Sequence, residues 1–95
     1  MTTAEINRRF QRFVIATTSD GFTSRFEVKM AINFNEVKKI AVNHLKGVLD
    51  RAHGRGDHTV RIYGLDFVDT ATEEQQRNGL SLMDWVEYPE ALFVL

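Results

Sequence analysis

The dipeptide Asp20-Gly21 constrains the fold of this chain more than any other feature, because it separates two segments of alternating polarity. Asp-Gly favours a two-residue type I′ turn, in which both central residues have positive φ. The segment "FTSRFEVKM" after the turn alternates apolar or small side chains with polar ones, and "RFVIATTS" precedes the turn. This pattern predicts an antiparallel β-hairpin with one buried face.

The turn also predicts the register of the hairpin, with Phe13 opposite Val28 and Ile15 opposite Phe26. The inner face of the second strand then consists of the side chains Phe22, Ser24, Phe26, Val28 and Met30. We expect burial of Phe26 to matter most in the hairpin, so that Phe26→Ala would cost about 3–5 kcal/mol.

The segment after the hairpin predicts one main helix, from about Phe34 to His53. Its apolar residues recur at helical spacing and form one stripe: Phe34, Val37, Ile40, Ala41, Leu45, Val48, Leu49 and Ala52. Asn33 is expected to cap the helix, with Glu36 completing a capping box and Ile32 packing on Val37.

The stretch "RAHGRGDHTV", residues 51–60, combines two histidines, an Arg-Gly-Asp triplet and two glycines. His53, Asp57 and His58 are all acceptable metal ligands. His44 lies about half a turn out of phase with His53 on the helix and cannot readily complete such a site. We expect a simple helix-to-strand connection, with Gly54 in the left-handed position after the helix, and no metal or cofactor.

The remaining residues predict a third strand and a short extension. "HTVRIYGLDF" is expected to be a strand with Val60 and Ile62 toward the helix, and with a bulge at Gly64 that changes the phase to Leu65 and Phe67. A short helix capped by Thr70, with Glu73 at the box position, is expected to end near Gly79. Residues 80–95 admit a helical turn at Ser81 and Asp84, but we favour a turn or short strand followed by a final strand at about 91–95.

Together these elements predict one α+β domain, residues 1–95. Its antiparallel sheet begins with the N-terminal β-hairpin and packs on one main α-helix, giving a ββαβ core with a short C-terminal helix/strand extension. The chain is 43% hydrophobic, so a core can form without disulfides or metal. The expected core joins a sheet face to the helix stripe: Phe13, Ile15, Phe26, Val28, Val60 and Ile62 on Val37, Ile40, Ala41, Leu45, Val48 and Leu49.

The composition limits the cellular setting and the chemistry. The chain has no cysteine, and an intracellular, cytoplasmic location is the expectation. No apolar run approaches the ~18 residues of a membrane span, and the N-terminal segment lacks the apolar core of a signal peptide. There is no Gly-x-Ser-x-Gly motif, and the acidic pairs Glu73-Glu74 and Asp84/Glu87 are typical of a solvated face. We expect a protein that is not an enzyme.

Charge is divided unevenly along the chain. Residues 1–65 carry eleven Lys and Arg against six Asp and Glu, whereas residues 66–95 carry one Arg against seven acids. The predicted register places Arg12 opposite Lys29 on the outer face of the hairpin, where like charges repel. Three sources could compensate: Glu27 nearby, the acidic C-terminal third, or an external anion.

We hypothesise that the basic and acidic regions are separate surfaces, one of which carries the partner. The basic hairpin face consists of Arg8, Arg9, Arg12, Arg25 and Lys29. The acidic residues are Asp66, Asp69, Glu73, Glu74, Asp84, Glu87 and Glu90. The complete set of expected binding residues is Arg8, Arg9, Arg12, Arg25, Lys29, Arg61, Tyr63, Trp85 and Tyr88.

The most consistent function is that of a small non-enzymatic binding protein that modulates or inhibits a protein partner. Aromatic residues beside charges, as at Trp85 and Tyr88, are typical of protein interfaces, and a net charge of -1 permits self-association. The alternative is a nucleic-acid-binding module that uses the basic hairpin face. Sheets that bind single strands usually expose aromatic rings, and only Phe10, with Tyr63 as a second candidate, could lie on that face.

In size, cysteine-free composition and hairpin–helix–strand order, the chain resembles the small inhibitor or adaptor proteins that phages and mobile elements encode. This resemblance concerns scale and architecture, and it assigns no role to any residue.

Overall fold

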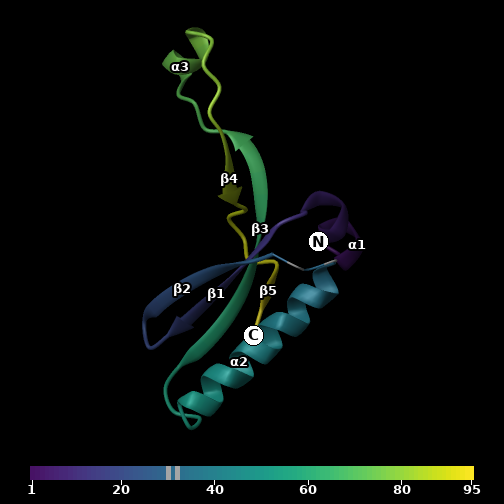
Figure 1. Cartoon of the computed structure of the whole chain (residues 1–95), viewed down its shortest axis with the longest axis vertical. Helices are drawn as coiled ribbons and strands as arrows, with labels where there is room; N and C mark the ends of the chain where they lie inside the picture. The colour runs from purple at the N-terminus through teal and green to yellow at the C-terminus, as the bar shows by residue number, and fades with distance from the viewer. Residues whose placement is uncertain (30, 32) are drawn as a thin grey trace.

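The computed structural model describes residues 1–29, 31 and 33–95 and has the expected α+β architecture (Figure 1). One antiparallel sheet has the strand order β2-β1-β3-β4, and a short β5 also pairs with β3. Helix α2 packs against one face of this sheet. The elements are α1 (Thr3–Arg9), β1 (Phe13–Ser19), β2 (Phe22–Val28), α2 (Phe34–Arg51), β3 (His58–Asp69), α3 (Glu73–Arg77), β4 (Met83–Glu87) and β5 (Phe93–Val94).

The hairpin β1–β2 is confirmed in both turn and register. Asp20 and Gly21 have φ angles of 49° and 88°, as a type I′ turn requires. Phe13 pairs with Val28 and Ile15 with Phe26, in one uninterrupted ladder. The expected position of Met30 lies outside the described residues.

Helix α2 begins at the predicted residue. The Asn33 side chain accepts a hydrogen bond from the amide of Glu36 at 3.0 Å and so caps the helix. The expected contact of Ile32 lies outside the described residues. Burial follows the predicted stripe only in part, because Val37 and Ala41 are fully buried whereas Leu49 is 38% exposed.

The C-terminal end of α2 corrects the prediction by one residue. Gly54 is left-handed as expected, with φ of 69°, but His53 comes directly after the C-cap and is left-handed as well, with φ of 53°. Its amide donates to the carbonyl of Asp50, and the amide of Gly54 donates to the carbonyl of Leu49. These two bonds form a Schellman motif, which is usually built on glycine at the position that His53 occupies.

Replacing His53 with glycine should therefore stabilise the protein. A left-handed conformation costs a non-glycine residue about 1–2 kcal/mol, part of which is offset by the greater freedom of glycine in the unfolded chain. We expect His53→Gly to raise the free energy of unfolding by about 0.5–1 kcal/mol in urea titrations. Gly54→Ala, at a φ of 69°, is the opposite control and should lower it. A loss of stability in His53→Gly would contradict this account of the helix end.

The connection from α2 to β3 is the helix-to-strand connection expected for "RAHGRGDHTV". The Asp20 carboxylate accepts a hydrogen bond from the amide of Asp57 at 2.9 Å, and this bond connects the hairpin turn to the loop. Gly56 has φ of 83°, and a Cβ there would lie 2.7 Å from the Asp20 carboxylate. The ring nitrogens of His58 lie 2.9 Å from Ser19 Oγ and 2.6 Å from the carbonyl of Arg55. His58 therefore has a structural role in this loop.

Strand β3 runs through Gly64 without the predicted bulge. The ladder with β1 pairs Phe13 with Gly64 and continues in the same register, since the amide of Leu65 donates to the carbonyl of Arg12. A Cβ at Gly64 would lie 2.4 Å from the ring of Phe10. Glycine is needed here because an aromatic ring lies directly on the strand, which is the other common reason for glycine in a strand.

The core lies between α2 and the inner face of the sheet, but its N-terminal part was not predicted. Its buried members are Ile6, Phe10, Phe13, Ile15, Phe34, Val37, Ala41, Val60 and Ile62. Helix α1, capped by Thr2 and Glu5 in a capping box, contributes Ile6 and leads into Phe10. Phe10 is 2% exposed, so the expectation that it lies on a basic outer face is wrong.

The inner face of β2 is less buried than predicted. Phe22 is 83% exposed and Phe26 is 38% exposed, with the Phe26 ring 5.0 Å from that of His44. The hairpin extends past the region that α2 covers (Figure 1). The prediction that Phe26 is the main buried residue of the hairpin is therefore wrong.

The upper half of β3 leaves the body together with β4 and α3 and forms a projecting arm, residues 65–87 (Figure 1). Phe67 pairs with Trp85, and Val68 with Asp84, in the two-stranded part of the arm. The molecule measures 55 × 30 × 22 Å, and its radius of gyration is 16.1 Å. A compact domain of this length would have a radius of gyration of about 12 Å. The arm accounts for this elongation.

A short helix and two short strands follow β3, as predicted, although the helix begins later than expected. Helix α3 is capped by Thr72 with Gln75 at the box position, so the expected cap at Thr70 is wrong by two residues. Thr70 instead extends the β3–β4 pairing, since its amide and its hydroxyl both donate to the carbonyl of Leu82. Gly79, with φ of 79°, ends the helix as expected. A short strand and a final strand follow, as predicted.

Candidate protein-binding surface

The outer face of the sheet, on the side away from α2, carries a layer of long polar side chains. Val14 and Ala16 in the inner strand β1 point outward, yet they are only 8% and 4% exposed. Their cross-strand neighbours include Arg25 and Glu27 on β2 and Tyr63 on β3. Long charged side chains can cover apolar surface with their methylene groups. The outer face is therefore partly apolar beneath its charged groups.

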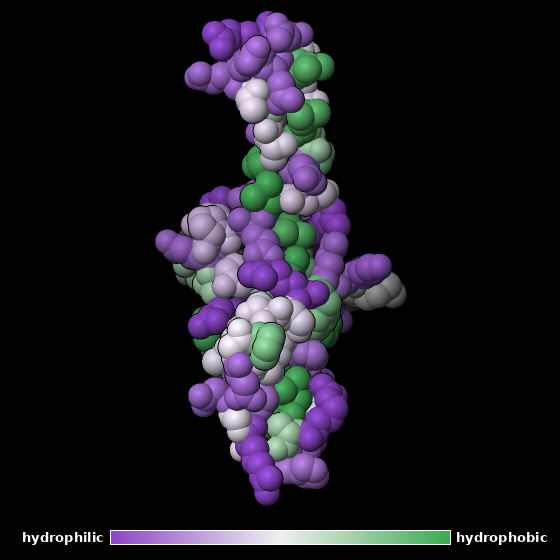
Figure 2. Space-filling view, turned by 90° about the vertical axis from the view of Figure 1, so that its left-hand side faces the viewer, coloured by the Kyte–Doolittle hydropathy of each residue, from purple (hydrophilic) through white to green (hydrophobic). Residues whose placement is uncertain are grey.

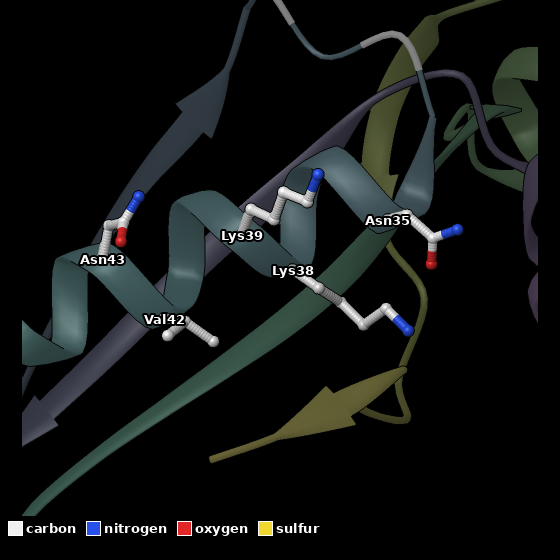
Figure 3. Close-up of a pocket in the computed structure, with 5 residues that line it drawn as sticks. All are labelled: Asn35, Lys38, Lys39, Val42 and Asn43. Carbon is white, nitrogen blue, oxygen red and sulfur yellow. The ribbon is translucent and has the colours of Figure 1, made fainter.

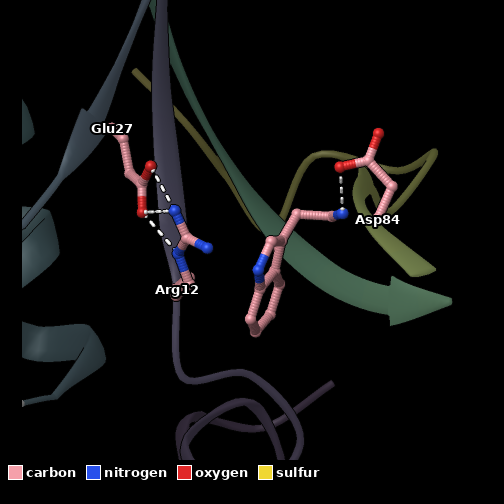
Figure 4. A network of polar contacts seen from close by, with 4 residues as sticks. Arg12, Glu27 and Asp84 are labelled. Carbon is pink, nitrogen blue, oxygen red and sulfur yellow. Dashed lines mark hydrogen bonds and ion pairs between the residues drawn. The ribbon is translucent and has the colours of Figure 1, made fainter.

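Arg12, directly before β1, lies beside Glu27 on this face (Figure 4). Its Nη2 donates to Glu27 Oε2 at 2.6 Å, and its guanidinium carbon lies 4.4 Å from the centroid of the Trp85 ring. The hydrogen bond from Arg12 lowers the pKa of Glu27 below its ordinary value, and the same pair raises the pKa of Arg12. Arg12 is thereby held between a carboxylate and an aromatic ring. Asp84, on β4, accepts a hydrogen bond from the backbone amide of Trp85 at 2.8 Å.

The basic and acidic regions meet at two ion pairs, so they are not fully separate surfaces as the sequence had suggested. Arg9 forms an ion pair with Asp66 at 3.1 Å, and Arg25 forms one with Glu87 at 3.0 Å. Both pairs lie where the arm leaves the body. The suspected repulsion between Arg12 and Lys29 is offset by Glu27. Glu27 and the acidic C-terminal third thus both compensate the positive charges of this face.

The structure brings together only some of the expected binding residues. Arg12, Arg25 and Trp85 share the outer face. Tyr63 and Arg61 extend that face along β3, and both are half-buried. Tyr88 instead packs with Phe10 and lies 4.5 Å beneath the guanidinium of Arg9. Arg8 on α1 and Lys29 after β2 are exposed and stand apart from this group.

The strongest feature of the surface was missed from the sequence. Apolar side chains on both strands and in the connection of the arm are between 37% and 54% exposed: Phe67, Val68, Leu80, Leu82, Met83, Trp85 and Val86. Phe67 and Trp85 face each other across the ribbon with ring centroids 5.0 Å apart. Val68 and Val86 lie on the opposite side of the same ribbon, because successive residues of a strand alternate. Figure 2 shows hydrophobic residues along the arm and a hydrophilic tip.

The arm is held in shape by Asp69. Its carboxylate accepts hydrogen bonds from the amides of Ala71 and Leu82 and from Ser81 Oγ. The two amide bonds lower the pKa of Asp69. This carboxylate therefore stays charged at neutral pH and ties the end of β3 to the segment before β4.

Further depressions lie elsewhere on the described surface. One of about 640 Å³ lies on the outward side of α2, lined by Asn35, Lys38, Lys39, Val42 and Asn43 (Figure 3). Within residues 1–29, 31 and 33–95, no group of three His, Asp or Glu side chains could hold a metal ion. None of the described helices is long and apolar enough to cross a membrane.

No family model, curated protein or solved structure matches the chain.

Proposed function

We propose that this chain is a non-catalytic binding module that modulates a partner protein, and that the arm, residues 65–87, is the part that contacts the partner. The observation that carries this proposal is the exposure of seven apolar side chains, five on a ribbon that is only two strands wide and two in its connection. A two-stranded ribbon has no second layer to cover its faces, and it is marginal in water by itself. Burial against a partner would cover the exposed faces of the ribbon and would also stabilise its two strands.

The exposed area is large enough for a specific interface. The seven side chains present on the order of 600 Å² together, divided between the two faces of the ribbon and its connection, whereas the largest single apolar patch on a typical monomer is about 300–600 Å². A standard protein interface buries about 800 Å² on each partner. A partner that surrounds the ribbon and contacts both faces would bury an area of this order. Phe67 and Trp85 supply the aromatic anchors that interfaces favour.

The charge of the arm indicates the kind of partner. Between residues 66 and 87 there are six Asp and Glu and one Arg. Asp66 and Glu87 are paired with the body, but Glu73 and Glu74 lie at the arm's end in helix α3 and are exposed. The complementary surface is an apolar groove bordered by Lys and Arg.

Two finer points belong to the same proposal. The absence of cysteine supports placing this binding in the cytoplasm. The resemblance in size and element order to phage-type inhibitors and adaptors supports an inhibitory or adaptor role. Nucleic-acid binding is less well supported, because Arg9, Arg12 and Arg25 are engaged in ion pairs and Phe10 is buried.

The test is capture of partners from a lysate of the source cells with the tagged chain. The double variant Phe67→Ser/Trp85→Ser should capture at least tenfold less of each specific partner, because anchor residues dominate interface energies. Leu49→Ser is the matched control, since Leu49 on α2 is 38% exposed and Trp85 is 37% exposed. It should capture as the wild type does.

The double variant should stay folded but melt at a somewhat lower temperature, because Trp85 also contacts Phe67 and Arg12. Capture is therefore compared well below both melting temperatures. Equal capture by the double variant and the wild type would refute the arm as the binding site. Loss of all captured material after nuclease treatment would instead favour the nucleic-acid alternative.

A further inference from the structure

Strand β2 forms one edge of the sheet, and its outward backbone groups can be identified. The two-residue turn makes Ser19 and Phe22 a hydrogen-bonded pair, and such pairs alternate along an antiparallel ladder. Ser24 and Phe26 therefore bond to β1 as well. The amides and carbonyls of the alternate residues Thr23, Arg25 and Glu27 point away from the sheet.

The β1–β3 ladder agrees with this assignment. The amide of Leu65 donates to the carbonyl of Arg12, so the even-numbered residues of β1 bond to β3. Its odd-numbered residues are left to bond to β2. In the part of the chain that the structure describes, β1 is the only strand paired with β2.

This edge has few of the features by which proteins usually prevent edge-to-edge pairing. Such features are charged side chains (lysine above all), proline, a β-bulge or a very short strand. Strand β2 has seven residues in an uninterrupted ladder, with neither proline nor lysine, and its charged residues are Arg25 and Glu27. Its inner face exposes Phe22 at 83% and Phe26 at 38%. An open, regular edge with exposed phenylalanines is suited to accept another strand.

We propose that β2 pairs in antiparallel fashion with β2 of a second copy of this chain, about a twofold axis at Arg25. In this register Thr23 lies opposite Glu27 of the second copy, and every outward amide and carbonyl of the edge gains a partner. On the inner face Phe22 lies opposite Val28 of the second copy, and Phe26 lies opposite its Ser24. Apolar and small side chains thus meet, as they do between β1 and β2. The two sheets become one.

Charges on this edge are compatible with self-pairing. The two Arg25 side chains face each other, but each forms an ion pair with its own Glu87 at 3.0 Å. Each also has Glu27 of the second copy as a diagonal neighbour. The other edges are less suited, because β5 has two residues and β4 belongs to the acidic arm. The proposal uses residues other than those of the arm, so it goes beyond the proposed function.

The absence of cysteine allows a direct test of this register. Position 25 faces itself across the axis, so two Cα atoms there lie about 5.5 Å apart, within the range that a disulfide spans. Two residues at position 24 are diagonal neighbours about 7–8 Å apart, beyond that range. In a buffer with oxidised glutathione, Arg25→Cys should form a covalent dimer at least tenfold faster than Ser24→Cys. Glu74→Cys, at the end of the arm, reports the rate of random collision.

Analytical ultracentrifugation provides a second measurement without cysteine. The wild type should sediment as a dimer in the micromolar range. Thr23→Pro should sediment as a monomer with only a small loss in melting temperature. The Thr23 amide points outward, so no backbone bond to β1 is broken, and only the exposed side-chain bond to Thr18 Oγ1 at 3.0 Å is lost. Thr23→Pro should also retain the arm's partner, which separates this proposal from the proposed function.

Three results would overturn the proposal. The first is a wild type that is monomeric throughout the micromolar range. The second is cross-linking of Arg25→Cys no faster than that of Glu74→Cys. The third is faster cross-linking at position 24 than at position 25, which would show a different pairing.

Discussion

Gly64→Ala should lower the free energy of unfolding by about 3 kcal/mol, at the upper end of the range for overpacking a core. The added Cβ would lie 2.4–2.6 Å from three atoms of the Phe10 ring. The ring cannot easily move away, because it is 2% exposed and packs on Phe13 and Tyr88 with centroids 6.4 and 5.6 Å distant. The backbone of Gly64 is fixed as well, since its carbonyl accepts a hydrogen bond from the amide of Tyr88 at 2.8 Å.

The sign of this effect is informative because glycine is otherwise unfavourable in a strand. Without a steric conflict, alanine in the middle of β3 should be the more stable residue, by roughly 0.5–1 kcal/mol. Gly47→Ala in helix α2 is the matched control, where the new Cβ meets only Arg51 Nη1 at 3.4 Å. We expect this control to be stabilised by up to about 1 kcal/mol through helix propensity.

A double-mutant cycle assigns the conflict to Phe10. Phe10→Ala alone should cost about 3–5 kcal/mol, and Gly64→Ala should cost little when added to it, because the ring is gone. Urea titrations of the four proteins measure the coupling. Additive effects of the two substitutions would show that Phe10 does not pack on Gly64.

Gly64 also illustrates which structural features can be predicted from one sequence. An isolated glycine within a strand pattern indicates either a bulge or a close approach, and only the position of the approaching group separates the two. That group is Phe10, which follows a helix that had not been predicted. The capping box of Thr2 and Glu5 was the available signal for this helix.

Local features were predicted well because they depend on neighbouring residues. Asp20-Gly21 determines both the turn and the register of the hairpin, and Asn33 determines the start of α2. The predicted helix ends were wrong by one or two residues where two neighbouring residues could each take the capping position. His53 and Gly54 both follow α2, and Thr70 and Thr72 both precede a Glu or Gln at the box position.

The arm could not be predicted from polarity alone, because it depends on relative lengths. Strand β3 has twelve residues and extends about 40 Å, whereas the eighteen residues of α2 extend about 27 Å. Strand β3 therefore extends beyond the end of α2, and no helix covers Phe67 and Val68. Trp85 and Arg12 were both candidate binding residues, but their contact depends on the pairing of β3 with β4, which their positions in the sequence do not determine.

Ile62→Ala should lower the free energy of unfolding by about 4 kcal/mol, a large share of the 5–15 kcal/mol typical of whole domains. Ile62 is 0% exposed and lies in the central strand, opposite Ile15 on β1 and Phe93 on β5. Removal of its side chain leaves a cavity in the middle of the core. Its neighbours in three elements cannot close this cavity without breaking their own ladders.

Phe26→Ala provides the contrasting measurement. We now expect it to cost about 1–2 kcal/mol rather than 3–5, because an edge side chain that is 38% exposed loses less burial and leaves a gap open to water. Its ring contacts His44, and burial lowers the pKa of that imidazole, so the neutral histidine is the form that packs there.

Urea titrations of Ile62→Ala and Phe26→Ala at neutral pH test which of the two substitutions costs more stability. A larger loss in Phe26→Ala than in Ile62→Ala would mean that the hairpin is buried in solution, and at micromolar concentration the edge-paired dimer would be the reason. Repeating the titrations with Thr23→Pro as the parent would decide this, since in the monomer Ile62→Ala must be the more damaging substitution.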